Sequence, residues 1–409
     1  MARGGDIGTA QPAALVGEHS RDLEADWPAG PKEAGGYRAG EEKLELLKTG
    51  PDSFERLKQL IEDAEETLRL YYYTFASDQC GRQILDRLVD AQNRGVEVHL
   101  IVDDFGSLET KDDFFQPLRD AGGHFCEFQP NLAQAYLLRN HQKIAIADAV
   151  RGIVGSFNIA DPHLTGDGAD AWRDIGVYIE GPAMTRLAIY YDRLEAWTSA
   201  PDRSHIRDLG ELLDDANETE GTVRWVFGGP ARKESAYVEQ VMSVLRDPGN
   251  VDMIMAYFAP SRRVLAAVRR KARTDRLRVI AARKTDVRLS RAAAWHTYRK
   301  LIRAGAEIYE YLPRLLHSKL IVTDDVVFIG SGNFDVRSLY INLELMLRVE
   351  RPDFHDQVCD LFCEEMQESE RVDMKALKAK AGPVSRFFWR ASYWAMTAVD
   401  RYFSRHFAR

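Results

Sequence analysis

Apolar and polar residues alternate along the chain with two periods, one typical of helices and one typical of strands. In the segment 53–61, apolar residues recur at helical spacing, and Ser53 stands where an N-cap is expected. The apolar run LRLYYYTF (68–75) then predicts a buried strand. Helical and strand patterns follow at 83–95 and 96–104, so the order of elements indicates βα units and a mainly parallel sheet.

Four blocks of the first half return in the same order in the second half. The pairs are LYYYTFA with IMAYFAP, AGGHFCEFQP with AGAEIYEYLP, RNHQKIAIAD with LHSKLIVTD, and GIVGSFNIAD with VVFIGSGNFD. A duplicated α/β unit explains this repetition best, and we expect the two copies to meet across a pseudo-two-fold axis. The polar, turn-rich stretch around residues 200–220 indicates the boundary between them.

The chain is therefore divided into four predicted segments. They are a flexible tail at 1–42, a first lobe at 43–205, a second lobe at 206–370 and a C-terminal segment at 371–409. The tail is rich in Gly, Ala and Glu and shows no sustained period, which is typical of a segment without a packed core.

Composition limits the class of protein. With 409 residues, 45% of them apolar, the chain has ample material for a large core. A net charge of −8 argues against a surface built wholly for nucleic acid, so no nucleic-acid partner is expected. The four scattered cysteines (Cys80, Cys126, Cys359 and Cys363) are interpreted as buried thiols in a reducing compartment. No signal peptide and no run of about 18 apolar residues is evident, so the protein is expected to stay in the cytosol.

A motif with reactive side chains occurs twice. The arrangement His-x-Lys-x4-Asp is formed by His141, Lys143, Asp148, His317, Lys319 and Asp324. Alternate residues of a strand share a face, so each histidine projects with its lysine. Lysine neutralises phosphoryl oxygens, and imidazole serves as nucleophile or acid–base catalyst, so the pair suits a phosphate substrate. Two copies with the same spacing predict an active site built from both motifs. For Asp148 and Asp324, each near the far end of its strand, a structural role such as a salt bridge or a turn is favoured over catalysis.

Each motif is followed by Gly-Ser-x-Asn. The polar residues of these two stretches are Ser156, Asn158, Ser331 and Asn333. Glycine lets the backbone approach a ligand, while the hydroxyl and amide groups bind its oxygens. Two such half-sites facing each other suit a two-step displacement at phosphorus, in which one histidine attacks and the other protonates the leaving alkoxide.

The duplicated motif resembles the HKD signature of the phospholipase D superfamily, and its context is similar to that of bacterial cardiolipin synthases. The similar blocks include RNHQKIAIAD, GSFNIAD and AWRDIGVYIEGPA in the first half, and LLHSKLIVTDDVVFIGSGNFDVRSLYINLELMLRV in the second. The similarity runs over residues 43–366. It implies two duplicated α-β-α sandwich units with mixed, largely parallel sheets, related by a pseudo-two-fold axis.

The resemblance also implies a reaction. Two phosphatidylglycerols would condense to cardiolipin and glycerol through a phosphatidyl-histidine intermediate, without a metal or another cofactor. His141 and His317 would be the nucleophile and the general acid, with His141 expected to attack. The groups implied to hold the phosphoryl group are Lys143, Lys319, Asn158 and Asn333. Phosphatidylethanolamine as the phosphatidyl donor is a variant of the same chemistry.

Each histidine also needs an acidic partner that fixes its tautomer. Asp174 in WRD and Glu344 in NLE stand at the acidic positions after the two motifs, with ordinary ion pairs as the alternative reading. The partner of His141 is expected at Asp174. The run DVRSLYIN is expected to shape the glycerol or headgroup site through Asp335, Arg337, Ser338 and Asn342.

The first copy departs from the family pattern. Gly155-Ser156 replaces a pair of glycines, IADP follows it, and the Arg-Ser element of the second half is missing. These differences leave the substrate open. A hydrolytic phospholipase D would differ only in using water to resolve the intermediate. A nucleic-acid phosphodiesterase is a further alternative, but it would need a basic groove lined with aromatic residues. A binding module without catalytic activity is another, and the two complete motifs argue against it.

The C-terminal segment combines aromatic and basic residues. Its apolar members are Phe387, Phe388, Trp394, Met396, Val399, Tyr402 and Phe403, and its arginines are Arg386, Arg390, Arg401, Arg405 and Arg409. Such a helix is typical of an interfacial anchor on anionic lipid, and a helix packed on the protein with a solvated basic face is the alternative. The prediction is peripheral association with the cytoplasmic side of a bacterial inner membrane.

Overall fold

The computed structural model of the protein describes residues 42–130, 138–166, 168, 170–200, 206–231 and 234–407. Side chains are described neither at residue 206 nor beyond residue 398. The predicted tail at 1–42 thus lies outside the described residues, apart from Glu42, and so do the side chains of the last arginines and aromatics of the chain.

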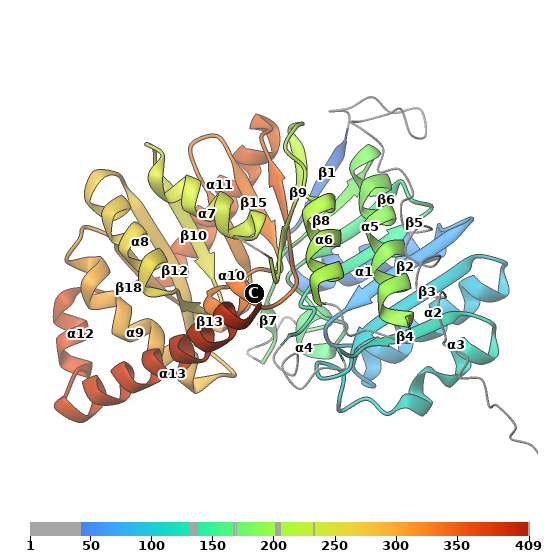
Figure 1. Cartoon of the computed structure of the whole chain (residues 1–409), viewed down its shortest axis with the longest axis horizontal. Helices are drawn as coiled ribbons and strands as arrows, with labels where there is room; N and C mark the ends of the chain where they lie inside the picture. The colour runs from blue at the N-terminus through green and yellow to red at the C-terminus, as the bar shows by residue number, and fades with distance from the viewer. Residues whose placement is uncertain are drawn as a thin grey trace, which may run out of the picture.

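Each half of the chain builds one large sheet (Figure 1). The two large sheets repeat one strand order. The first sheet runs in the order β1 (Lys43–Leu47), β8 (Gly176–Glu180), β6 (Arg151–Gly155), β5 (Lys143–Ala147), β2 (Thr67–Tyr72), β3 (Glu97–Asp103) and β4 (His124–Phe128). The second runs in the order β9 (Val223–Gly228), β17 (Glu344–Val349), β15 (Val327–Gly330), β14 (Lys319–Val322), β10 (Val251–Met255), β12 (Leu277–Lys284), β13 (Glu307–Leu316) and β18 (Ser369–Arg371). The first seven strands of each correspond pair by pair, which confirms the duplication.

Both sheets are mixed, as predicted, but most of their pairs are antiparallel. Along the two strand orders just given, parallel pairing joins β2 to β3 and β3 to β4 in the first sheet, and β10 to β12 and β12 to β13 in the second. The expectation of largely parallel sheets is therefore wrong. One reason in each sheet is a short turn, which can join only antiparallel strands. In the first sheet it joins β5 to β6 and has φ values of 53° at Asp148 and 56° at Ala149, and in the second sheet it joins β14 to β15.

Helices cover the outer faces of the sheets and fill the space beside the central core. Those of the first half are α1 (Gly50–Glu62), α2 (Gln79–Asn93), the 3-10 helix η1 (Asp112–Phe115), α3 (Gln116–Asp120), α4 (Asp161–Leu164) and α5 (Pro182–Ser199). The remaining helices are α6 (Ile206–Ala216), α7 (Ala236–Arg246), α8 (Arg262–Thr274), α9 (Arg288–Ile302), α10 (Val336–Tyr340), α11 (Pro352–Gln367), α12 (Met374–Lys380) and α13 (Pro383–Phe407).

Helix α1 begins earlier than the sequence pattern predicts. Its N-cap is Thr49, whose hydroxyl accepts the backbone N–H of Asp52 at 3.2 Å. Pro51 fits the first turn because that turn leaves its N–H groups unpaired in any case. Ser53, the expected cap, lies buried inside the helix, and its hydroxyl donates to the carbonyl of Thr49 at 2.9 Å.

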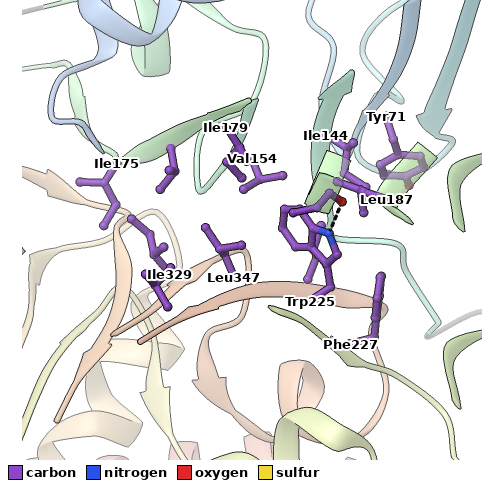
Figure 2. Close-up of a cluster of buried hydrophobic side chains, with 14 of the residues drawn as sticks. Tyr71, Ile144, Val154, Ile175, Ile179, Leu187, Trp225, Phe227, Ile329 and Leu347 are labelled. Carbon is purple, nitrogen blue, oxygen red and sulfur yellow. Dashed lines mark hydrogen bonds between the residues drawn. The ribbon is translucent and has the colours of Figure 1, made fainter. Parts of the chain in front are cut away.

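The two sheets face each other across one shared hydrophobic core (Figure 2). In β5, Ile144 and Ile146 point into this central core, while Ala145 and Ala147 point to the outer core under α1 and α2. Because such strands are buried on both faces, their sequences are continuous apolar runs without polar alternation. A third core lies between the second sheet and helices α7, α8 and α9.

Two further observations concern the cysteines and the helices. The four cysteines are free thiols, of which Cys80 is buried, Cys126 and Cys359 are half-buried and Cys363 is exposed, so the expectation of burial holds for Cys80 alone. Among the described residues, no helix is both long and apolar enough to cross a membrane.

Trp225 on β9 connects the two halves. Its side chain is buried in the central core, and its indole N–H donates to the carbonyl of Ala183 on α5 at 2.7 Å. We expect Trp225→Ala to lower the free energy of unfolding by about 3–5 kcal/mol, since it removes a large side chain from a shared core. Chemical denaturation followed by circular dichroism measures this. A loss below about 1 kcal/mol would show that the halves do not depend on this contact.

Candidate active site

The two halves exchange short backbone segments at the ends of the two repeated motifs. The strand β7 (Trp172–Arg173) belongs to the first half but pairs in parallel with β13 of the second, just before His317. The backbone N–H of His317 donates to the carbonyl of Arg173 at 2.8 Å. In the reverse direction, the N–H of His141 donates to the carbonyl of Leu343 at 2.8 Å. Each histidine is thus held by the backbone of the other half.

This exchange sets the acidic partner of each histidine. His317 Nδ1 lies 2.7 Å from Asp174 Oδ1, and His141 Nδ1 lies 3.1 Å from Glu344 Oε2. The expectation that Asp174 would partner His141 is wrong, because β7 carries Asp174 across to the other sheet. Both acids are side-chain partners of a motif histidine, but each belongs to the opposite motif.

The two histidines lie near each other in a buried position. Their ring centroids are 6.5 Å apart. A carboxylate at Nδ1 fixes the proton on that nitrogen and leaves the lone pair on Nε2, which is the form an attacking imidazole needs. Burial and the neighbouring charge of Lys143 lower the pKa of His141 to about 4. Burial and Lys319 likewise hold the pKa of His317 well below its usual value, against the opposing effect of Asp174.

The two lysines have equivalent positions and are fully buried. Lys143 Nζ donates to the carbonyl of His141, and Lys319 Nζ to the carbonyl of His317, both at 2.5 Å. Burial lowers the pKa of Lys319 to about 8 and holds that of Lys143 well below its usual value, where the charge of Lys319 adds to the effect. A bound phosphate anion would counter this and keep both ammonium groups charged.

The serines of the Gly-Ser-x-Asn stretches contact the carboxylates. Ser156 donates to Asp174 and Ser331 to Glu344, in both cases at 2.5 Å. Each serine oxygen also accepts a backbone N–H, from Ile175 and from Leu345 respectively. The hydroxyl protons that we expected to meet a phosphate are therefore used to hold the acidic partners of the histidines.

The two asparagines differ between the halves. Asn158 accepts the backbone N–H of Thr74 at 3.2 Å, and its Nδ2 lies 3.3 Å from His163 Nε2. Asn333 is equally buried, but its Oδ1 has no hydrogen-bond partner among the described residues. A buried amide oxygen without a partner is costly, so Asn333 is the residue of this set that most needs a ligand or water.

His163 is a third buried histidine at the site, and no motif in the sequence identifies it. Its Nδ1 lies 2.7 Å from Asp174 Oδ2, and its ring packs against Trp172 and His317 with centroid distances of 4.3 and 5.1 Å. Asp174 therefore accepts hydrogen bonds from both His163 and His317. The ligand-type atoms of these three residues cluster closely, but hydrogen bonds from each Nδ1 to its own carboxylate oxygen account for the arrangement.

The aspartates of the repeated motif hold turns. Asp148 accepts the backbone N–H groups of Glu65, Glu66 and Thr67 and pairs with Arg151. These donors keep the pKa of Asp148 below its usual value, although its partial burial acts in the opposite direction. Asp324 accepts the backbone and side-chain N–H groups of Asn250.

The run after Asn333 forms the start of α10. Asp335 caps this helix by accepting the N–H of Ser338 at 2.9 Å, and burial raises the pKa of Asp335 to about 6. Arg337 lies in α10, and its carbonyl accepts the N–H of the buried Asn342 at 2.8 Å.

The chain matches the family model described as cardiolipin synthase, PLD-like domain, over residues 57–192 and 248–366, and it belongs to this family. It is 28% identical to cardiolipin synthase 1 of Bacillus cereus over 86% of this chain and 71% of that protein. It is 30% identical to cardiolipin synthase A of Pseudomonas putida over 81% of this chain and 70% of that protein.

Two solved structures share the fold. A phosphatidylserine synthase from Haemophilus influenzae superposes with a TM-score of 0.66 over 88% of this chain and 94% of that one, at 12% identity. A polyphosphate kinase from Porphyromonas gingivalis gives a TM-score of 0.57 over 96% of this chain and 57% of that one, at 14% identity. At such identities the likeness concerns the fold alone.

We expect His163→Phe to lower turnover by up to about 100-fold, because Asp174 and Asn158 both lose a partner that positions them. The phenyl ring keeps the packing on Trp172. Burial and Lys319 have the largest effects in lowering the pKa of His317, and His163 adds to them, so removing His163 should shift the limb of the pH–rate profile that reports His317 to higher pH.

His163→Gln retains an amide donor and should recover part of the activity. Steady-state rates measured across pH for the wild type and both variants test this role. An unchanged profile in His163→Phe would mean that His163 only fills space.

Proposed function

We propose that the protein is a cardiolipin synthase-type phosphatidyltransferase, which condenses two phosphatidylglycerols to cardiolipin and glycerol. The observation that carries the proposal is the pair of histidines, 6.5 Å apart between ring centroids, each with an acidic partner from the opposite half. Two symmetric half-sites suit a reaction in which one phosphoryl group is bound, released from one alcohol and passed to another. The relatives that carry the name cardiolipin synthase support the same reaction.

The charges of the site fit the first step. Lys143 and Lys319 balance Asp174 and Glu344, so an entering phosphodiester, with one negative charge, favours protonation of one histidine. We assign the attack to the neutral His141. Its Nε2 forms a bond to phosphorus, the bond from phosphorus to the glycerol oxygen breaks, and the Nε2 proton of His317 moves to that oxygen. Glycerol leaves, and a phosphatidyl-histidine remains.

The second step reverses the first with a new alcohol. A hydroxyl of a second phosphatidylglycerol gives its proton to the now neutral His317 and attacks phosphorus. The bond between phosphorus and His141 breaks, and cardiolipin is released. Lys143, Lys319 and the side-chain N–H of Asn333 would donate to the phosphoryl oxygens in both steps, while Ser156 and Ser331 position the carboxylates.

Hydrolysis is the second candidate, because water in place of the lipid alcohol would yield phosphatidic acid. The two reactions differ only in what reaches the intermediate. Cleavage of nucleic acid uses the same chemistry, but the net charge of −8 does not favour a polyanionic substrate.

The purified protein is expected to convert phosphatidylglycerol liposomes to cardiolipin plus glycerol, as lipid and glycerol analysis would show. His141→Ala and His317→Ala should each lower the rate by at least about 10²–10⁴-fold, since each removes one partner of the displacement. His124→Ala, at an exposed histidine of β4, is the matched control and should keep the wild-type rate. Phosphatidic acid as the main product would favour hydrolysis, and unchanged lipid with cleaved oligonucleotide would exclude both lipid reactions.

We also propose that α13 attaches the protein to the membrane surface, on the cytoplasmic side where the lipid substrate would be reached. The helix packs on the protein through Trp389 and Tyr393, which contact Trp295 and His296 of α9. Its opposite face exposes four large apolar side chains, namely Val384, Phe387, Phe388 and Trp394. Exposed aromatics beside arginines are typical of a helix that lies in the lipid interface.

The triple variant Phe387→Ser, Phe388→Ser and Trp394→Ser should bind vesicles at least about tenfold more weakly, whether or not the lipid is anionic, because it removes the inserting surface. Truncation before α13 is a poorer test, since it would also uncover the buried face of α9. Leu108→Ser, at an exposed leucine of the first half, is the control. Wild-type sedimentation of the triple variant with vesicles would contradict the anchor.

A further inference from the structure

A basic groove lies between α13 and the outer helices of the second half, and neither His141 nor His317 lines it. It is a cavity of about 800 Å³ whose lining includes Arg262 and Arg269 of α8, Lys300 of α9 and Arg390 of α13. A second cavity of about 600 Å³, lined by α9, α12 and α13, shares Lys300 and Arg390 with it. The two cavities together form one surface that follows the first turns of α13, and we call it the α13 groove.

The α13 groove concentrates positive charge in a chain that is acidic overall. The cations that line it are Arg262, Arg269, Arg299, Lys300, Lys378, Arg386 and Arg390, and no Asp or Glu lines it among the described residues. Seven such cations beside a net charge of −8 for the whole chain indicate a local site for an anion.

Among the arginines that line the groove, Arg269 has a buried donor without a partner in the described part of the chain. Its Nε is buried, yet no described residue accepts a hydrogen bond from it. Guanidinium groups are matched to phosphate oxygens, and a buried unpaired donor is costly. The charges of Lys300 and Arg390 also reach His296, whose pKa they and its burial hold below the usual value.

The surroundings of these cations favour a lipid over a soluble phosphate. Leu377, Ala381 and Trp389 line the second cavity, so an apolar surface continues from the cationic end. Phe387 and Trp394 stand at the rim with 71% and 65% of their surface exposed. A phospholipid matches both the cationic and the apolar part of the groove, because it carries an anionic headgroup beside hydrocarbon chains.

We infer that the α13 groove binds the phosphodiester headgroup of an anionic phospholipid, which is distinct from the lipid that reacts at the histidines. The inference rests on the proposed function in one respect: an enzyme that acts on lipids works at the surface of a bilayer. Helix α13 also packs against α10, which follows Asn333 of the active site, so a lipid in the groove would hold the second half against the membrane (Figure 1).

The test compares two double variants that remove the same charge from one helix. Arg262→Ala with Arg269→Ala removes groove cations, and Arg270→Ala with Arg273→Ala removes exposed arginines that do not line the groove. Full-length protein is sedimented with phosphatidylcholine vesicles, with and without phosphatidylglycerol. The groove variant should lose at least about tenfold more affinity for the anionic vesicles than its control, and the two should bind neutral vesicles equally.

Equal losses in the two variants would overturn the inference, because they would reflect charge alone. Competition by soluble glycerol 3-phosphate as effective as that by anionic vesicles would overturn it too, since the occupant would then not be a lipid. Repeating the comparison in the His317→Ala background, in which phosphatidylglycerol would not be consumed, should give the same ratio of vesicle affinities between the two double variants. The protein could fail to make cardiolipin while the groove variant still loses more affinity for anionic vesicles than its control. That result would count against the proposed function and not against this site.

Discussion

The active site depends on a backbone exchange between the two halves of the chain. The strand β7 leaves the first half to pair with β13 and places Asp174 beside His317, while Leu343 of the second half bonds to the backbone of His141 and brings Glu344 to it. Neither half contains a motif histidine together with its acidic partner. Chemistry in this fold therefore requires the two halves to be held in one relative position.

The central core supplies that position. Apolar residues of both sheets meet there, and the hydrogen bond of Trp225 reaches across to α5. Because the core is shared, its packing determines where the histidines stand as well as how stable the protein is. Burial also adjusts the charges: it lowers the pKa values of both histidines and of Lys319, so the site gains most from an anion that restores the positive charges.

Much of the fold is predictable, because the two halves contain similar sequence blocks in the same order. The repeated blocks fall on equivalent strands of two equivalent sheets. The pairing direction does not follow from the sequence, because the turn between β5 and β6 passes through Asp148 and Ala149 and contains none of the Asn-Gly or Asp-Gly signals that predict a hairpin. The partner of His141 was mispredicted because a two-residue strand such as β7 has no periodicity from which its pairing follows.

His163 shows a further limit of sequence reasoning. A single histidine within a short helix carries no spacing signal, and its role arises only because Asp174 and Trp172 converge on it in space. The two faces of α13 likewise depend on tertiary packing: the amphipathic pattern was visible, but packing on α9 decides that Trp389 is buried while Trp394 is exposed.

The crosswise pairing of histidines and acids is the central claim, and imidazole nitrogen shifts test it most directly. In protein with ¹⁵N-labelled histidine, the ¹⁵N chemical shifts of Nδ1 in His317 and in His141 are measured for the wild type and for Asp174→Asn. We predict that the substitution moves the Nδ1 signal of His317 and leaves that of His141 in place. A shift at His141 with no change at His317 would show that each acid serves the histidine of its own half, and would contradict the account.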